Sequence, residues 1–124
     1  MKWIVWRLAN GSKFYGQVDK GDLGKIGNES IQIYNPMASY TTARQPEIEG
    51  GSASMVVSIR PLLDLEDYDD NFQTFNTSHF ISWQTVNVLK CIASLDNVVE
   101  ELKKRKKELE DMEKADNNEK EIKI

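Results

Sequence analysis

The residues with the most versatile catalytic side chains are the single histidine, His79, and the single cysteine, Cys91. A cysteine nucleophile needs a positioned base, and family-specific motifs usually surround such a pair. Neither residue lies in a motif of that kind, and Cys91 falls within an apolar repeat of helical spacing. The sequence therefore predicts a protein that is not an enzyme and has no catalytic residues.

An acidic segment is the second feature with the residue types of a binding site. Asp64, Glu66, Asp67, Asp69 and Asp70 are spaced like the first ligands of a calcium loop, but the central glycine and terminal glutamate of an EF-hand are missing. We therefore interpret residues 63–78 as a solvated acidic loop. Neither a phosphate-binding glycine-lysine loop nor a Cys/His zinc spacing occurs, so no metal and no cofactor are expected.

Composition indicates one domain with an appendage. The chain has 124 residues, of which 40% are hydrophobic and 29% are charged, and the charged residues are concentrated after Val99. A single cysteine excludes an internal disulfide and agrees with a reducing compartment. No apolar stretch approaches the roughly 18 residues of a membrane span, and no signal peptide is recognisable. These features predict a cytoplasmic protein without a membrane partner.

Charge is distributed unevenly along the chain, although the net charge is −4. Residues 1–44 carry six Lys/Arg and three Asp/Glu. Residues 45–80, in contrast, carry one Lys/Arg and seven Asp/Glu. Nucleic-acid-binding domains are usually basic overall, so the total charge disfavours RNA. The basic N-terminal third nevertheless allows a local positive surface.

Five runs of alternating or β-branched residues predict strands, at residues 3–8, 13–19, 31–34, 54–60 and 79–83. Asn10-Gly11 predicts a two-residue type I′ turn between the first two strands. Gly16 lies in the middle of the second strand and predicts a sharp bend. Asn35-Pro36 is expected to end the third strand, because proline cannot extend a hydrogen-bonded ladder. Residues 37–54 are then expected to form an extended linker with a Gly-Gly tip, in which Thr41 and Thr42 could lengthen a strand.

These strands favour a mainly β fold, with a small antiparallel barrel over residues 1–85. Alternation places Ile4, Trp6, Leu8, Phe14 and Val18 on the core face. The three tryptophans, Trp3, Trp6 and Trp83, are expected in the core or at a subunit interface, with base stacking as the alternative. Tyr15 and Tyr34 point away from the core face, which favours burial at an interface.

An apolar seam with spacings of three and four predicts a long C-terminal helix over residues 86–115. Its members are Val88, Cys91, Leu95, Val98, Leu102, Arg105, Leu109 and Met112. Residues 116–118 are expected to end the helix, leaving residues 116–124 as a polar tail. A seam on one helix needs a partner, either the barrel of the same chain or other copies, and we favour self-association.

The order of these features resembles the first half of the Sm/LSm family of RNA-binding small barrels. The resemblance rests on the hairpin, on Gly16, Val18 and Asp22 in the family's relative spacing, and on Ile31 and Ile33 in the third strand. Ile59-Arg60 is similar to the start of the family's second motif. The resemblance covers roughly residues 3–60, with residues 79–84 as the last strand; the helix lies outside it.

The resemblance implies a five-stranded, strongly bent Sm-like (SH3-like) barrel in a homo-oligomeric ring of about five to eight subunits. It also implies single-stranded RNA as the ligand. Asp22 would brace the loop, Asn28 would bond a base edge and Lys25 would contact phosphate. Arg60 would stack on a base or bind phosphate; alternatively, it pairs with a carboxylate of the acidic loop.

Two functions therefore follow from the sequence. The first is non-catalytic binding of single-stranded RNA by a homo-oligomeric ring, which the Sm pattern and the basic N-terminal third favour. The second is a structural scaffold or adaptor, for instance in a viral particle, without a nucleic-acid ligand. The acidic loop, the net charge of −4 and the lack of a base-stacking residue two positions after Asp22 favour this second function.

Overall fold

The computed structural model describes residues 1–46, 48–62 and 71–122. The chain forms two units, a sheet unit that ends at Val86 and a helix unit that begins at Asn87. The sheet unit contains the strands β1 (Lys2–Arg7), β2 (Lys13–Val18), β3 (Ser30–Arg44), β4 (Ser54–Pro61), β5 (Phe72–Asn76) and β6 (Ser82–Thr85). Two short 3-10 helices, η1 (Lys20–Lys25) and η3 (Thr77–His79), lie between strands. The predicted mainly β fold with one C-terminal helix is confirmed.

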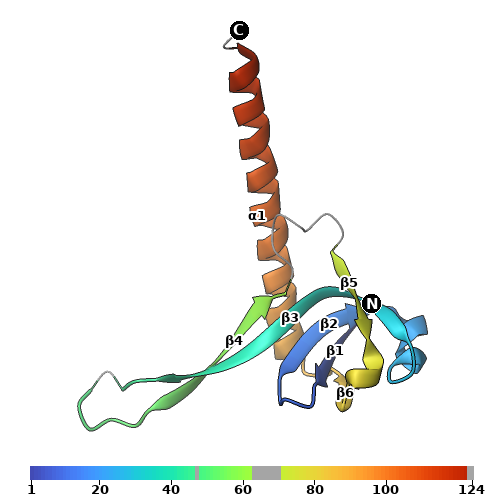
Figure 1. Cartoon of the computed structure of the whole chain (residues 1–124). Helices are drawn as coiled ribbons and strands as arrows, with labels where there is room; N and C mark the ends of the chain where they lie inside the picture. Colours follow the sequence, from blue (N-terminus) through green and yellow to red (C-terminus); the bar gives the residue numbers. More distant parts are fainter. Residues whose placement is uncertain (47, 63–70, 123–124) are drawn as a thin grey trace. The chain divides into compact units, whose positions relative to one another are not determined.

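All strand pairs are antiparallel, in the order β4-β3-β2-β1-β6, with β5 pairing β3 away from this path (Figure 1). Closure into a barrel, in contrast, is not seen: the sheet is open. Among the described residues no ladder joins β5 to β6, because the chain passes between them through η3. The predicted sheet is therefore present without the predicted closure.

The β1–β2 hairpin has a three-residue loop, so the prediction of a type I′ turn is wrong. The amide of Gly11 donates to the Leu8 carbonyl at 3.0 Å, and the amide of Leu8 donates to the Ser12 carbonyl at 3.1 Å. Gly11 has a φ of 84°, while Asn10 has a negative φ and accepts a bond from the Ser12 amide through its side chain. This is the pattern of a turn followed by a left-handed glycine. With a loop of this length, Arg7 of β1 lies directly opposite Lys13 of β2.

Strand β3 continues through Asn35-Pro36, where the sequence predicted its end. Residues 30–34 pair with β5 and residues 37–44 pair with β4, so the strand changes partners at this point. Asn35 adopts a φ of 49°, which asparagine tolerates better than most residues. Two residues of β3 bulge opposite Gly16, so the missing N–H of Pro36 interrupts no ladder. The predicted linker is instead the second half of β3 and the tip of the β3–β4 hairpin.

Two further segments differ from the prediction. Strand β5 lies inside the stretch interpreted as an acidic loop, of which residues 63–70 fall outside the described residues. The predicted strand over residues 79–83 is instead the end of η3, a connection and the start of β6. The sheet unit therefore has six strands, since the Phe72–Asn76 segment adds one that its polar residues concealed.

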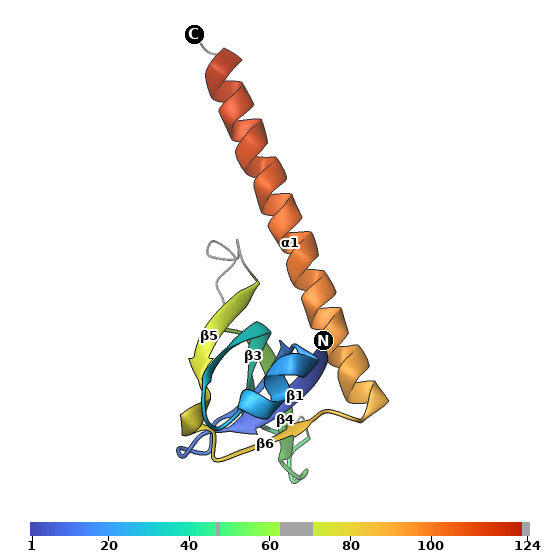
Figure 2. The same ribbon diagram turned by 90° about the vertical axis from the view of Figure 1, so that its right-hand side faces the viewer.

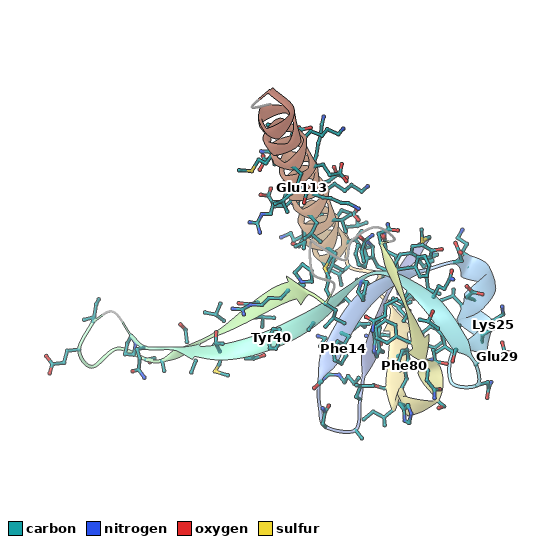
Figure 3. All side chains as sticks on the ribbon, turned by 45° about the horizontal axis from the view of Figure 1, so that its top comes forward. Phe14, Lys25, Glu29, Tyr40, Phe80 and Glu113 are labelled. Carbon is teal, nitrogen blue, oxygen red and sulfur yellow. The ribbon has the colours of Figure 1, made fainter. Side chains whose placement is uncertain are left out.

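The core of the sheet unit is centred on Trp6. Its ring stacks on Phe80 at a centroid distance of 5.0 Å and on Phe14 at 5.7 Å; Figure 3 labels both phenylalanines. The buried cluster comprises Ile4, Trp6, Val18, Ile26, Ile31 and Ile33. The predicted core face of the hairpin is confirmed. A Cβ on Gly16 would overlap Ile33 Cγ2 and lie 3.2 Å from the Trp6 ring, so this position requires glycine.

The helix unit consists of one continuous helix, α1 (Leu89–Ile122) (Figures 1 and 2). It continues through residues 116–118, which were expected to end it. Asp and Asn are weak helix formers rather than breakers, and no glycine or proline follows. Of the predicted seam, Leu95 and Leu102 are buried, whereas Val88, Leu109 and Met112 are exposed.

Candidate functional site

The β2–β3 loop contains three of the four residues that the Sm resemblance assigned to RNA. Asp22 and Lys25 lie in η1, and Asn28 follows with its amide bonded to the Lys25 carbonyl at 3.1 Å. Lys25 Nζ contacts Asp22 Oδ1 at 3.1 Å. The hydrogen bond and the charge of Asp22 raise the pKa of Lys25 above its ordinary value, so the carboxylate favours the charged form of this lysine. Lys25 is therefore already partnered by a carboxylate.

Thr77 connects this loop to the β5–β6 connection. Its side chain is fully buried, and its Oγ1 accepts a hydrogen bond from the Gly27 amide at 2.9 Å. The same hydroxyl donates to the Glu29 carbonyl. Gly27 has a φ of 98°, and the threonine hydroxyl satisfies its amide. Sequence reasoning missed Thr77, because a single threonine has no local signal.

The fourth residue, Arg60, lies elsewhere on the sheet. It is exposed on β4 opposite Ala38, and its guanidinium lies over the Tyr40 ring, 5.7 Å from the centroid. In Figure 3, Lys25 lies at one edge of the sheet unit and Tyr40 lies well away from it, near the middle. The structure therefore brings Asp22, Lys25 and Asn28 together in one loop and leaves Arg60 apart from them.

A projecting hairpin is the most exposed apolar part of the sheet unit (Figure 1). We call it the arm and define it as residues 40–44 of β3 with residues 54–58 of β4. The β2–β3 ladder ends at Ser39, so each arm strand has only the other as a neighbour among the described residues. Met55 is 69% exposed, Val57 63% and Tyr40 49%. Ile48, near the tip, is 77% exposed.

A second feature is a pair of cations at the loop end of the β1–β2 hairpin. Arg7, the last residue of β1, lies directly opposite Lys13, the first residue of β2. Lys13 Nζ lies over the Tyr15 ring at 5.3 Å from the centroid. Two open cavities, of about 180 and 380 Å³, adjoin this pair, and both are lined in part by Arg7 and Lys13. We call the pair with its two cavities the basic groove.

Sequence reasoning recognised the basic N-terminal third but not the basic groove. The pairing of Arg7 with Lys13 depends on the length of the hairpin loop. Asn10-Gly11 predicted a two-residue loop, whereas the structure has a loop of three residues. The exposed arm was missed for a related reason, since Asn35-Pro36 was expected to end β3. If a three-residue loop had been assumed, pairing the residues of the two strands outward from the loop would have placed Arg7 opposite Lys13.

The described residues contain no group of three or more His, Cys, Asp or Glu side chains arranged to hold a metal ion. Of the residues with versatile catalytic side chains, His79 lies in η3 and Cys91 in α1. Within the described part of the chain, no helix is both long and apolar enough to cross a membrane.

No family model matches the chain, and no curated protein matches it significantly. Functional inference for this protein therefore depends on the arm and the basic groove.

Proposed function

We propose that this protein is a non-catalytic assembly protein that joins copies of itself through the arm. The observation that carries the proposal is the exposure of Met55, Val57 and Tyr40 on a projecting two-stranded ribbon. An isolated two-stranded hairpin is only marginally stable in water. Large exposed apolar surface on such an element is typical of a protein interface.

The composition of the arm supports contact with another protein. The side chains of Met55 and Val57 share one face of the ribbon, and Val56 lies on the other. The described residues 37–43 and 51–59 include no charged side chain, in a chain of which 29% of residues are charged. Arg44 is the single charged residue of the arm, so most of the ribbon lacks the charge that keeps a solvent-exposed hairpin soluble.

The outer edge of β4 supports association with a second copy. Strand β4 ends the sheet order, and no described strand pairs with its outer side. Natural proteins commonly protect such edges with lysine, proline or a bulge. Residues 54–59, Ser-Met-Val-Val-Ser-Ile, contain none of these. Two copies of this uncharged segment of β4 can pair antiparallel with each other, which satisfies both edges symmetrically.

The test is the molar mass of the full chain, measured by light scattering over a range of concentrations. We expect the wild-type protein to associate and the double variant Met55→Lys/Val57→Lys to remain monomeric, because four ammonium groups would meet in each dimer. The matched control is Ile81→Lys/Leu89→Lys. It adds the same charge at two exposed apolar positions outside the arm and should associate like the wild type.

A wild-type protein that is monomeric at all concentrations would overturn the proposal. So would a Met55→Lys/Val57→Lys variant that associates as strongly as the wild type. Loss of association in both double variants would point to general charge repulsion instead of the arm.

Single-stranded RNA binding at the Sm-type residues has less support from the geometry. Lys25 is paired with Asp22, and Arg60 lies on another part of the sheet beside Tyr40. The sheet is open, unlike the closed barrel of the Sm family, and the ring of that family depends on the resemblance alone. Asn28 is exposed in the β2–β3 loop, where its side chain is accessible to a base edge.

A further inference from the structure

The basic groove carries an inference that is independent of self-association. A row of directly opposed residues crosses the five strands of the sheet path: Ile59, Ser39, Lys13, Arg7 and Ser82. Directly opposed residues of antiparallel strands project their side chains from the same face of a sheet. Arg7 and Lys13 are thus held side by side in the middle of this row.

No carboxylate of the described residues balances this cation pair. Within the described part of the chain, neither Arg7 nor Lys13 has a carboxylate at salt-bridge distance, and no carboxylate lines either cavity. Like charges directly opposite each other destabilise a sheet. The arrangement therefore costs stability in the free protein, and a bound anion would relieve that cost.

The two cavities indicate the shape of the anion. The smaller one is lined, besides the cations, by Val5, Ser82, Trp83 and Gln84. The larger one is lined by Gly11, Ser12, Ser39, Tyr40, Thr41 and Val57. Because Arg7 and Lys13 line both, an anion bound by them has room for a substituent on each side. A phosphodiester has this form, since its one negative charge lies between two ester groups, whereas a phosphate monoester would fill only one cavity.

The lining also suits the sugars of a nucleic acid as the two substituents. Ser82 lines the smaller cavity, and Ser12 and Ser39 line the larger one. Ser12, Ser39 and Ser82 offer hydroxyl groups to phosphate or sugar oxygens. We propose that the basic groove binds a phosphodiester of single-stranded nucleic acid, with one sugar in each cavity.

Fluorescence polarisation of labelled oligo-U and oligo-dT with the nuclease-treated full chain tests this proposal, at about 50 mM salt where electrostatic binding is strong. We expect Arg7→Gln/Lys13→Gln to weaken binding by about tenfold or more. The same variant should unfold at an equal or higher temperature than the wild type, because it removes a repulsive pair. This second readout separates a lost site from a lost fold.

Two matched double variants complete the experiment. Lys25→Gln/Arg60→Gln removes the same charge from the Sm-type positions, and Lys2→Gln/Lys20→Gln removes it from exposed positions outside the groove. Both should bind nearly like the wild type. Competition by the dinucleotide UpU should exceed competition by UMP, because only the diester reaches both cavities.

Three results would overturn the proposal: no binding of either oligonucleotide, full binding by Arg7→Gln/Lys13→Gln, or equal loss in all three double variants. Loss of binding only in Lys25→Gln/Arg60→Gln would assign the ligand to the Sm-type residues instead. Equal binding of oligo-U and oligo-dT would support recognition of the phosphodiester, and a preference for oligo-U would add the 2′-hydroxyl as a contact.

Discussion

Thr77 shows how one buried hydroxyl can order a loop. In Thr77→Val the side chain keeps its shape, but the Gly27 amide and the Glu29 carbonyl lose their partner. We expect a loss of about 1–3 kcal/mol in the free energy of unfolding, measured with urea. Amide exchange at Gly27 should accelerate in Thr77→Val and stay slow in Thr77→Ser, which retains the hydroxyl. Unchanged exchange at Gly27 in Thr77→Val would contradict this role.

Gly16 shows the opposite constraint, a position where any side chain is too large. Gly16→Ala would overlap Ile33 Cγ2 beside the Trp6 ring, so we expect a loss of about 1–3 kcal/mol in unfolding free energy. Gly24→Ala is the matched control, because nothing lies within 4 Å of the added Cβ. It should change stability by no more than about 0.5 kcal/mol. Combined with Ile33→Ala, Gly16→Ala should cost less than it does alone.

At the scale of the element, periodicity predicted the strands well and their limits poorly. The alternation of Ile4, Trp6 and Leu8 identified β1 and its core face, because burial of one face requires that period. Asn35-Pro36 misled the prediction, because proline ends a strand only where its missing N–H would be needed. At the bulge, where β3 changes partners, it is not needed.

The candidate site was harder to predict than the fold, since it depends on register. A two-residue loop at Asn10-Gly11 would have paired Arg7 with Phe14 and separated it from Lys13. Because the loop has one residue more, the register shifts and Arg7 lies opposite Lys13 instead. A shift of one residue exchanges the faces of a strand, so no pattern within β1 or β2 alone reveals the groove. The choice of loop depends on packing around Trp6, which is a property of the tertiary structure.

The arm makes a prediction at the same scale. Amides of residues 54–58 that face outward from β4 have no strand partner among the described residues and should exchange rapidly in dilute solution. At concentrations where the chain associates, pairing of two β4 edges should slow their exchange. Amides of β1 and β2 should keep the same rates, as an internal control. Concentration-independent exchange in the arm would place the self-association elsewhere in the chain.

At the scale of the whole molecule, the net charge of −4 conceals two surfaces of different chemistry, a largely uncharged arm and a basic groove. Their interactions should respond differently to salt. Apolar contacts of the arm are not screened by salt, whereas a phosphodiester bound by Arg7 and Lys13 competes with counterions. Raising salt from about 50 to 500 mM should weaken oligonucleotide binding about 5- to 25-fold if one or two phosphates are neutralised.

Sedimentation velocity at the two salt concentrations, with and without labelled oligo-U, measures both interactions in one experiment. The oligomer should persist at high salt while the label moves to the free fraction. Dissociation of the oligomer by salt would mean that charged residues, and not Met55 and Val57, hold the copies together. If the label stayed bound at high salt, stacking on aromatic residues would dominate over Arg7 and Lys13, because stacking between apolar rings is insensitive to counterions.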